Sequence, residues 1–407
     1  MKFLLRFFRF TTKPIPKKVL FSLMNAILIC FLPKLTKILR YGPITVVGML
    51  KSSSGLGQAA RLTLNALKEQ GYKINSFDIS GLFVEEFLDV QLPSNGSFEQ
   101  QGGVIIIKNN PVHLPLILFF LGRKRLRNKK IIAYSVWETA SIPNQWVRPC
   151  KLVHEIWTPS DFSAEAFRSK IPNIPIRVVP YPLRMPLKNS FNRKHFGLPN
   201  GLIILSVADL GSGFNRKNII STIEVFRTIY DKVKNVTMVL KLSGTKRYAK
   251  EKEEVNTLIA DVPNILIIDQ FLSVDEIQSL IKSSDIIVSL HRSEGFGLLM
   301  AEAMWHAKAI IATPWSANIT FLPKNCACYV KYKLVEINDL QNMYRDKGVW
   351  AEPDIKDAAV KLLKLSNDKK LRNELGVNAK KHAMKFFTKE AFAKQTDDSL
   401  DKYAEKF

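Results

Sequence analysis

The chain has 407 residues, 46% of them hydrophobic and 24% charged, which is the composition of a soluble globular protein long enough for two α/β domains. Its 60 lysines and arginines exceed the 36 acidic residues and give a net charge of +24, which favours nucleic acid, anionic lipid or phosphorylated substrates as partners. Of the four cysteines only Cys326 and Cys328 are close together. Because no second pair or nearby histidine completes a zinc site, we expect reduced cytosolic thiols.

The amino-terminal segment 1–42 is basic and apolar, and no acidic residue precedes Glu69. Its most apolar part, 19–32, is shorter than the roughly 20 apolar residues of a membrane-spanning helix. No small-residue cleavage site follows, so we do not expect a cleaved signal peptide. We expect segment 1–42 to lie on an anionic membrane surface, and a disordered basic tail followed by a core helix is the alternative.

Strands and helices alternate from residue 44 onwards. Strand 44–50 runs into a Gly/Ser loop that ends at Gly57, but a dinucleotide fingerprint would need a third glycine and a ribose-binding acid. Further elements are expected as strands at 73–78, 103–108, 131–136, 155–160 and 176–180, and as helices at 58–70, 114–130 and 161–167. The second of these helices ends in a basic run, 123–130, which is either a nucleic-acid patch or the usual positive charge of a helix end. On a membrane-facing domain this run would add to the basic surface.

A second set of elements follows the linker 181–199, which is rich in Pro, Asn and Lys and indicates a domain boundary. Strand 202–207 leads through a flexible loop to Arg216 and Lys217, just before a helix at 219–233. Fixed cations at a helix start suit a diphosphate, although ordinary exposed bases are the alternative. Lys241, near the end of strand 237–244, either reaches the phosphates or is solvated.

The stretch 284–321 has the clearest pattern. A strand at 286–290, a loop with Gly295 and Gly297, a helix at 298–305 and a strand at 309–313 form a βαβ unit, which binds ligands at the carboxyl ends of its strands. The glycines permit close approach of a ligand, and the helix start presents free N–H groups. Glu294 and Glu302, with seven residues between them, are candidates to bind a polyol, although exposed glutamates are common.

The runs SEGFGLLMAEAM and AKAIIATPWSAN resemble the donor-sugar motif of the retaining family-4 glycosyltransferases, and the resemblance spans about 44–390. It implies the α/β GT-B fold, in which two facing Rossmann-like domains enclose a cleft and a C-terminal helix crosses back. The corresponding divisions are an acceptor domain at 43–185, a nucleotide-sugar domain at 195–385 and a helix at 386–407 that packs on the first domain.

The resemblance also implies roles for individual residues. The catalytic candidates are Lys217, Glu294, Arg216 and Glu138, and the donor-binding candidates are Gly57, Lys241, Gly295, Phe296, Gly297, Leu298 and Glu302. The family usually has an arginine where this chain has Ala208-Asp209, so either Arg216 takes over that role or the phosphate is held differently. Glu138 is either an acceptor-side group or a structural carboxylate. Gly57 is preferred in its loop because its N–H opens the helix.

The implied activity is transfer of a hexose, with a lean towards mannose or a deoxyhexose, from a nucleotide-diphosphate sugar to a glycan or lipid-linked acceptor. No D-x-D pair lies between the glycine loops, so we expect neither a metal ion nor a cofactor. The runs W-S-A-N and H-R-S-E resemble bacterial enzymes of surface-polysaccharide assembly, on the cytoplasmic face of the inner membrane. A non-catalytic scaffold of the same fold is the alternative. Nucleic-acid binding is disfavoured because no RNP-type strand or recognition helix is present.

Overall fold

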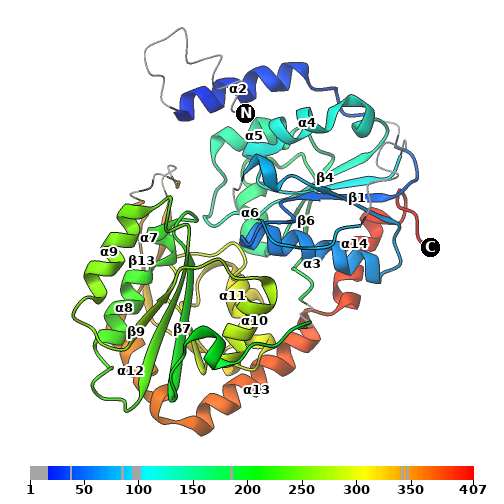
Figure 1. Cartoon of the computed structure of the whole chain (residues 1–407). Coiled ribbons are helices and arrows are strands. Elements are labelled where there is room, and N and C mark those ends of the chain that lie inside the picture. The colour runs from blue at the N-terminus through cyan, green and yellow to red at the C-terminus, as the bar shows by residue number, and fades with distance from the viewer. Residues whose placement is uncertain are drawn as a thin grey trace.

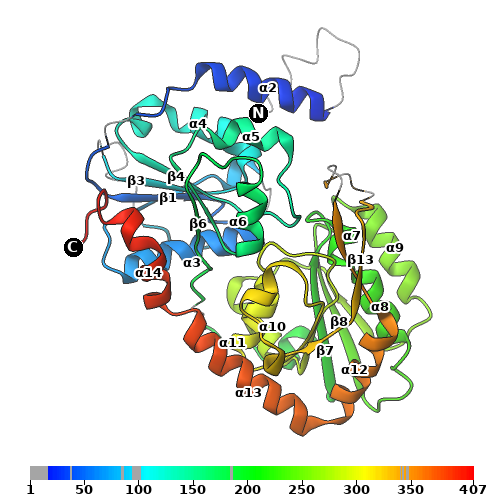
Figure 2. The same ribbon diagram turned by 180° about the vertical axis from the view of Figure 1, so that it is seen from behind.

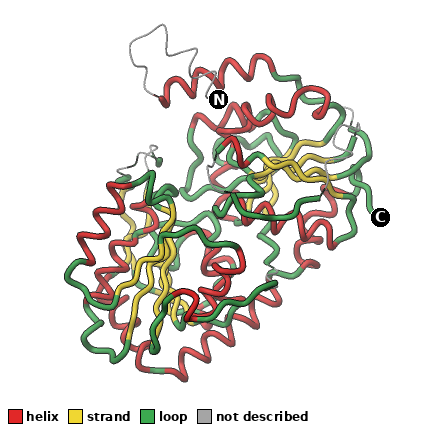
Figure 3. The backbone as a smooth tube through the Cα atoms, viewed as in Figure 1, coloured by secondary structure: helices red, strands yellow, loops and turns green. Residues whose placement is uncertain are grey.

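The computed structural model describes residues 17–36, 39–83, 87–93, 102–183, 187–339, 341, 343–344 and 348–407. Of the predicted membrane segment 1–42, residues 1–16, 37 and 38 lie outside the described residues. Figure 1 shows two α/β domains, the first mostly blue to cyan and the second mostly green to orange. Figure 3 shows that each domain has a sheet with helices on both faces.

The first domain contains a parallel sheet with the strand order β2-β1-β3-β4-β5-β6. Its strands are β1 (Ile44–Gly48), β2 (Ile74–Asp78), β3 (Val104–Lys108), β4 (Lys130–Tyr134), β5 (Glu155–Thr158) and β6 (Ile176–Val178). Neighbouring side chains alternate between faces, so Val46 joins the core beneath α3 (Gly55–Glu69) while Val47 joins the core with α4 (Leu114–Leu126). Both faces are covered, which explains the continuous apolar runs of β1, β3 and β4.

Further helices complete this domain. They are α2 (Lys17–Phe31), α5 (Asn144–Cys150) and α6 (Asp161–Arg168). Helix α2 contacts α4. The helix expected at 114–130 ends earlier, at Leu126, and the chain already leaves helical geometry at Gly122, where φ is 75°. Short 3₁₀ helices lie at Ser80–Leu82, Pro111–His113, Arg193–Phe196, Ser316–Thr320 and Lys324–Cys326.

The second domain also contains a parallel sheet, with the order β12-β11-β10-β7-β8-β9. Its strands are β7 (Leu202–Asp209), β8 (Val236–Ser243), β9 (Ile265–Ile268), β10 (Ile286–Ser289), β11 (Ala309–Ala312) and β12 (Cys328–Tyr329). Its helices are α7 (Phe214–Lys217), α8 (Ile219–Arg227), α9 (Ala249–Ile259), α10 (Val274–Ser283), α11 (Leu298–Trp305) and α12 (Ile355–Asn367). The strand order reverses between β7 and β10, which makes this pair the topological switch point where doubly wound sheets bind ligands.

An antiparallel ribbon that the sequence does not predict lies beside the second domain. It consists of β13 (Tyr332–Glu336) and β14 (Val349–Pro353). The ribbon is fixed to the loop after β10 because Arg292 donates two hydrogen bonds to the Glu352 carboxylate, at 2.5 and 2.9 Å. The backbone N–H of Ala351 also donates to the Arg292 carbonyl at 2.9 Å.

The carboxyl-terminal helices return to the first domain, as predicted. Helix α13 (Lys369–Phe386) runs along the second domain, and α14 (Lys389–Leu400) packs on the first (Figure 2). The Tyr72 hydroxyl hydrogen-bonds to Asp401 at 2.7 Å and to Asp397 at 3.1 Å. The two domains are therefore joined by a second crossing of the chain as well as by the segment between β6 and β7.

Candidate functional site

The predicted cation pair and the first predicted glutamate meet at the switch point of the second domain. Arg216 and Lys217 belong to α7, after β7, while Glu294 lies in the loop after β10. Because β7 and β10 are adjacent and parallel, the loops at their carboxyl ends lie side by side. The two loops are tied together by the backbone N–H of Arg292, which donates to the Arg216 carbonyl at 2.8 Å.

The geometry of α7 depends on its ends. Gly213 precedes the helix with a φ of 93°, and Asn218 ends it in the left-handed region with a φ of 55°. The Asn218 side chain donates to the Leu290 carbonyl at 3.0 Å, which fixes α7 against the end of β10. The reversal at Asn218 separates α7 from α8, so the pair Arg216-Lys217 lies on its own turn of helix.

The three charged side chains form an ion cluster in which Arg216 and Glu294 are buried and Lys217 is partly exposed. The Lys217 Nζ is 2.5 Å from one Glu294 oxygen, and the Arg216 Nη1 is 3.2 Å from the other. Arg216 is only 3% exposed, and its guanidinium also donates to the carbonyls of Ser293 and Ser212 at 2.7 Å. Burial opposes ionisation of Glu294, but the charges of Lys217 and Arg216 outweigh it and lower the pKa of Glu294 to about 2.

The first domain contributes Glu138, which follows β4, to the same cluster. The Ser293 hydroxyl donates a hydrogen bond to the Glu138 carbonyl. Burial raises the pKa of the Glu138 carboxyl group, and the positive charge of Arg216 partly offsets this rise. The four residues predicted to be catalytic therefore lie together, with Glu138 on one side of the domain interface and the ion cluster on the other.

The loop Gly295-Phe296-Gly297 forms much of the contact between the domains. A Cβ at Gly295 would lie 2.3 Å from the Val136 Cγ2, and the Ser160 hydroxyl donates to the Gly295 carbonyl at 2.8 Å. Phe296 is buried with its ring centroid 4.5 Å from that of Tyr181. Gly297 precedes α11 with a φ of 95°. The backbone at Gly295 thus lies close to the first domain, whereas the sequence pattern predicted that a ligand would lie close to it.

Glu302 lies on α11, separate from the ion cluster, and faces the first domain. It is 6% exposed, and burial raises its pKa to about 8, although a Gln278 hydrogen bond and the charge of Arg61 oppose the rise. Arg61 belongs to α3 and donates to the carbonyls of Leu50 and Ser52, at 2.9 and 2.7 Å. Glu302 therefore lies opposite the loop after β1. Leu298, at the start of the same helix, packs against the core.

Two other predicted ligand-binding residues have different surroundings from those expected. The Gly57 N–H, expected to be available to a ligand, donates to the Ser54 hydroxyl at 3.2 Å, because Ser54 caps α3. A Cβ at Gly57 would lie 2.4 Å from the Ser52 carbonyl oxygen, so this position requires glycine for packing. Lys241 is 3% exposed, and its ammonium group donates to the Leu242 carbonyl at 2.7 Å, near the end of β8.

Two residues of the site were not singled out from the sequence. Tyr344 lies between β13 and β14, and its side chain interacts with both Glu138 and Arg216. Its ring centroid is 5.2 Å from that of Trp137. His291 is fully buried beside the cluster, burial lowers its pKa to about 4, and neither ring nitrogen has a hydrogen-bond partner among the described residues. Its position three residues before Glu294 is the one sequence signal that could have identified it.

Metal-binding clusters and membrane-spanning helices are absent from the described part of the chain. There, no group of three or more His, Cys, Asp or Glu side chains is arranged to hold a metal ion. The four cysteines are free thiols. None of the helices in the described ranges is long and apolar enough to cross a membrane.

Comparison with solved structures defines the fold. HepE from Anabaena, crystallised with UDP and glucose, matches with a TM-score of 0.63 at 13% identity, over 89% of this chain and 100% of that chain. Sucrose-phosphate synthase from Thermosynechococcus elongatus matches at 0.62 and 15% identity, over 88% and 98%. WaaG, a glycosyltransferase involved in lipopolysaccharide biosynthesis, matches at 0.57 and 12% identity, over 87% and 99%. Such identities show the fold alone, and the chain has the GT-B fold.

Comparison with family models adds a match in the second domain. Residues 201–342 match the model described as glycosyl transferases group 1. The matched range contains Arg216, Lys217 and both glutamates of the predicted motif, Glu294 and Glu302. No curated protein matches the chain. The chain thus has the GT-B fold, and residues 201–342 within it are similar to group 1 glycosyl transferases.

Proposed function

We propose that this chain is a retaining, metal-independent glycosyltransferase that uses a nucleotide-diphosphate sugar. The observation that carries the proposal is the ion cluster of Arg216, Lys217 and Glu294 at the switch point of a domain similar to group 1 glycosyl transferases. Two cations held by a helix turn next to an interdomain contact fit the diphosphate of a donor. HepE supports a nucleotide-sugar donor by analogy, since its crystals contain UDP and glucose.

In the proposed reaction the bond between the anomeric carbon of the sugar and the diphosphate oxygen breaks. Lys217 and Arg216 stabilise the negative charge that develops on the leaving diphosphate, and because they are already fixed, little reorganisation is needed. The acceptor hydroxyl oxygen bonds to the anomeric carbon on the same face. Its proton passes to the departing phosphate oxygen, which retains the anomeric configuration without a protein nucleophile.

The remaining site residues orient the two substrates. Glu294 accepts hydrogen bonds from the sugar hydroxyls in addition to its ion pair with Lys217. The backbone N–H groups of Gly295 to Gly297 also bind the sugar. Glu302 accepts hydrogen bonds from the ribose of the nucleotide, and its position opposite the loop after β1 supports a donor that lies between the domains. In this proposal Glu138, which comes from the first domain, faces the acceptor, and Tyr344 beside it orients its carboxyl group.

The acceptor in this proposal is a glycan or a lipid-linked glycan of cell-surface polysaccharide synthesis at the cytoplasmic face of the membrane. Mannose or a deoxyhexose is the first sugar to test. The basic, apolar segment 1–42 supports a membrane surface as the working location.

A thermal-shift screen against nucleotide diphosphates and their sugars, with divalent metal or with chelator, tests the proposal. Binding to the folded state raises the melting temperature by mass action. We expect a shift with one nucleotide family that chelator does not remove, a smaller shift in Lys217→Ala, and an unchanged shift in the control Lys250→Ala on exposed α9. Absence of any nucleotide shift would overturn the donor site. Binding without sugar transfer to any acceptor would favour a non-catalytic scaffold.

A further inference from the structure

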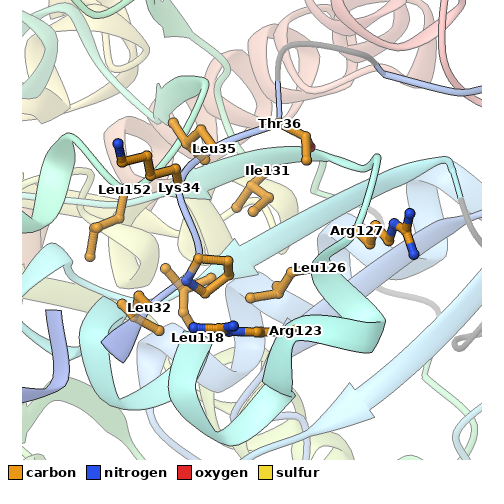
Figure 4. A pocket seen from close by; sticks show the side chains of 11 residues that line it. Leu32, Lys34, Leu35, Thr36, Leu118, Arg123, Leu126, Arg127, Ile131 and Leu152 are labelled. Atoms are coloured by element: carbon orange, nitrogen blue, oxygen red, sulfur yellow. The ribbon is translucent and has the colours of Figure 1, made fainter. Parts of the chain in front are cut away.

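A pocket of about 190 Å³ lies outside the candidate site, between α4 and the chain that follows α2 (Figure 4). Its walls are mostly aliphatic and come from Leu32, Leu35, Leu118, Leu126, Ile131 and Leu152. An apolar cavity of ~150 Å³ is large enough to hold a benzene molecule, so this pocket has room for a short length of hydrocarbon chain.

The helices beside the pocket expose large apolar side chains. Leu23, Ile27 and Phe31, at intervals of four residues, form one stripe of α2 and are 49%, 47% and 63% exposed. Phe119 and Phe120 of α4 are 50% and 52% exposed. Helix α2 lies on the outside of the first domain, over α4 (Figure 1). Apolar side chains gathered on one outer layer are typical of a surface that docks onto a partner.

The charged side chains that line the pocket are all basic. Lys34, Arg123 and Arg127 line it and are exposed. The sequence contains no aspartate or glutamate in 1–68 or in 100–137, the two stretches that form α2, α4 and most of the pocket wall. Exposed aliphatic and aromatic groups together with unopposed basic groups complement an anionic lipid surface, in which phosphates lie above hydrocarbon.

The position of the pocket separates it from sugar transfer. Ile131 and Leu152 lie at the amino ends of β4 and β5, whereas Glu138 follows the carboxyl end of β4. The pocket and the ion cluster therefore lie at opposite ends of the strands of the first sheet. A lipid in this pocket would hold the domain on the membrane and would not be the group that accepts the sugar.

We propose that this pocket takes one acyl chain of an anionic membrane phospholipid, with the lipid phosphate held by Arg123 and Arg127. The proposal extends the membrane location within the proposed function but does not depend on sugar transfer. It assigns membrane docking to the folded first domain, in addition to the residues before α2.

The test uses the full chain and co-sedimentation with vesicles of phosphatidylcholine, alone or mixed with phosphatidylglycerol. We expect binding only to the mixed vesicles. Arg123→Gln with Arg127→Gln should weaken it about tenfold or more, since each basic residue near an anionic surface adds to binding. The control Lys356→Gln with Lys381→Gln removes the same charge from exposed sites on α12 and α13, and it should bind like the unchanged chain.

A second arm tests the hydrocarbon pocket itself. Leu35→Trp fills the pocket without changing charge, and it should abolish the thermal shift produced by dissolved dihexanoyl phosphatidylglycerol. Glycerol phosphate should give no shift in any variant. A lipid shift that survives Leu35→Trp, or equal vesicle binding by the Arg123 and Arg127 variant, would overturn the proposal. Nucleotide shifts measured on the same variants report folding and the donor site separately, so each proposal can fail without the other.

Discussion

At the scale of single residues, the site is defined by how its charges are compensated. Glu294 stays ionised in a buried place because Lys217 and Arg216 are within 2.5 and 3.2 Å of its oxygens. Lys217 is the more accessible of the two cations, with 25% of its side chain exposed against 3% for Arg216. Lys217 is therefore the cation that a diphosphate, bound as proposed, reaches more readily.

The first prediction concerns Lys217→Ala. Removing a fixed cation that stabilises transition-state charge lowers kcat by about 10²- to 10³-fold, as for other preorganised donors. The KM for the donor should change less, because in the proposed complex Arg216 also contacts the diphosphate. Steady-state kinetics with the donor identified by thermal shift measures both. Equal losses in Lys250→Ala, on exposed α9, would show that general charge, rather than this position, matters.

The second prediction concerns the pH dependence of stability through Glu302. Its folded pKa of about 8 lies above the ordinary value of 4.5, so the folded state keeps a proton that the unfolded state releases between these values. The stability that Glu302 contributes at low pH is therefore lost as pH rises from 4.5 to 8. In Glu302→Gln the free energy of unfolding should fall by a few kcal/mol less over this pH range. Urea unfolding at several pH values measures it. An identical fall in both proteins would contradict the assignment.

The third prediction concerns Tyr344→Phe, which removes the hydroxyl shared by Glu138 and Arg216. A buried hydrogen bond of this kind contributes about 1 kcal/mol, so the loss of stability should be small. Loss of a hydrogen bond to the charged form raises the pKa of the Glu138 carboxyl group further. The pH–rate profile should therefore shift to higher pH. A lowered rate with an unshifted profile would indicate a merely structural role.

At the scale of elements, the parts predictable from the sequence are those with strong local patterns. The unit around β10, α11 and β11 was predicted because apolar strands, a glycine loop and a helical pattern follow one another within 284–313. The ribbon β13–β14 was not, because β13 is largely exposed and has no apolar alternation. Tyr344 depends on that ribbon for its place, so its contact with Arg216 could not be inferred from the chain.

The glycine loop shows the same limit. The pattern indicated that Gly295 needs close approach, but the neighbour, Val136 of the other domain, is a tertiary contact. Likewise, the residue type of Ser54 is typical of a helix cap, yet the Gly57 N–H was predicted to bind a ligand, and Ser54 accepts its hydrogen bond. Local rules therefore predict which backbone positions are special, and the tertiary fold determines what occupies the space beside them.

The fourth prediction concerns Gly295→Ala. Its Cβ would lie 2.3 Å from the Val136 Cγ2 and 2.9 Å from the Trp137 carbonyl oxygen, so the loop and the first domain must move apart. We expect a loss of activity of at least tenfold, since misplacement by about 1 Å costs on the order of 10²-fold in rate. Limited proteolysis should show a more accessible domain interface. Gly55→Ala, where an added Cβ meets nothing within 4 Å, is the control and should behave like the unchanged protein.

At the scale of the whole molecule, the first domain is completed by chain that follows the second domain in sequence. Lys130 forms a buried ion pair with Glu155 at 2.7 Å, and the Ser399 hydroxyl of α14 donates to the same carboxylate at 2.7 Å. The backbone N–H of Lys73 donates to the Glu405 carbonyl at 2.8 Å, so the chain end adds to the edge of the first domain beside β2. The first domain is thus incomplete without residues that follow the second in sequence.

The fifth prediction follows from this dependence and concerns Leu400→Ala. Leu400 is fully buried in the core that it shares with Leu67 and Tyr72, so truncation leaves a cavity and costs about 2–5 kcal/mol. Met384→Ala removes an apolar side chain of similar size from a position on α13 that is 58% exposed, and it should cost far less. Calorimetry should show the first domain of Leu400→Ala melting at a lower temperature, while nucleotide still raises the transition of the second domain. If both domains shifted down together, α13 and α14 would transmit stability across the interface, and the domains would form one cooperative unit.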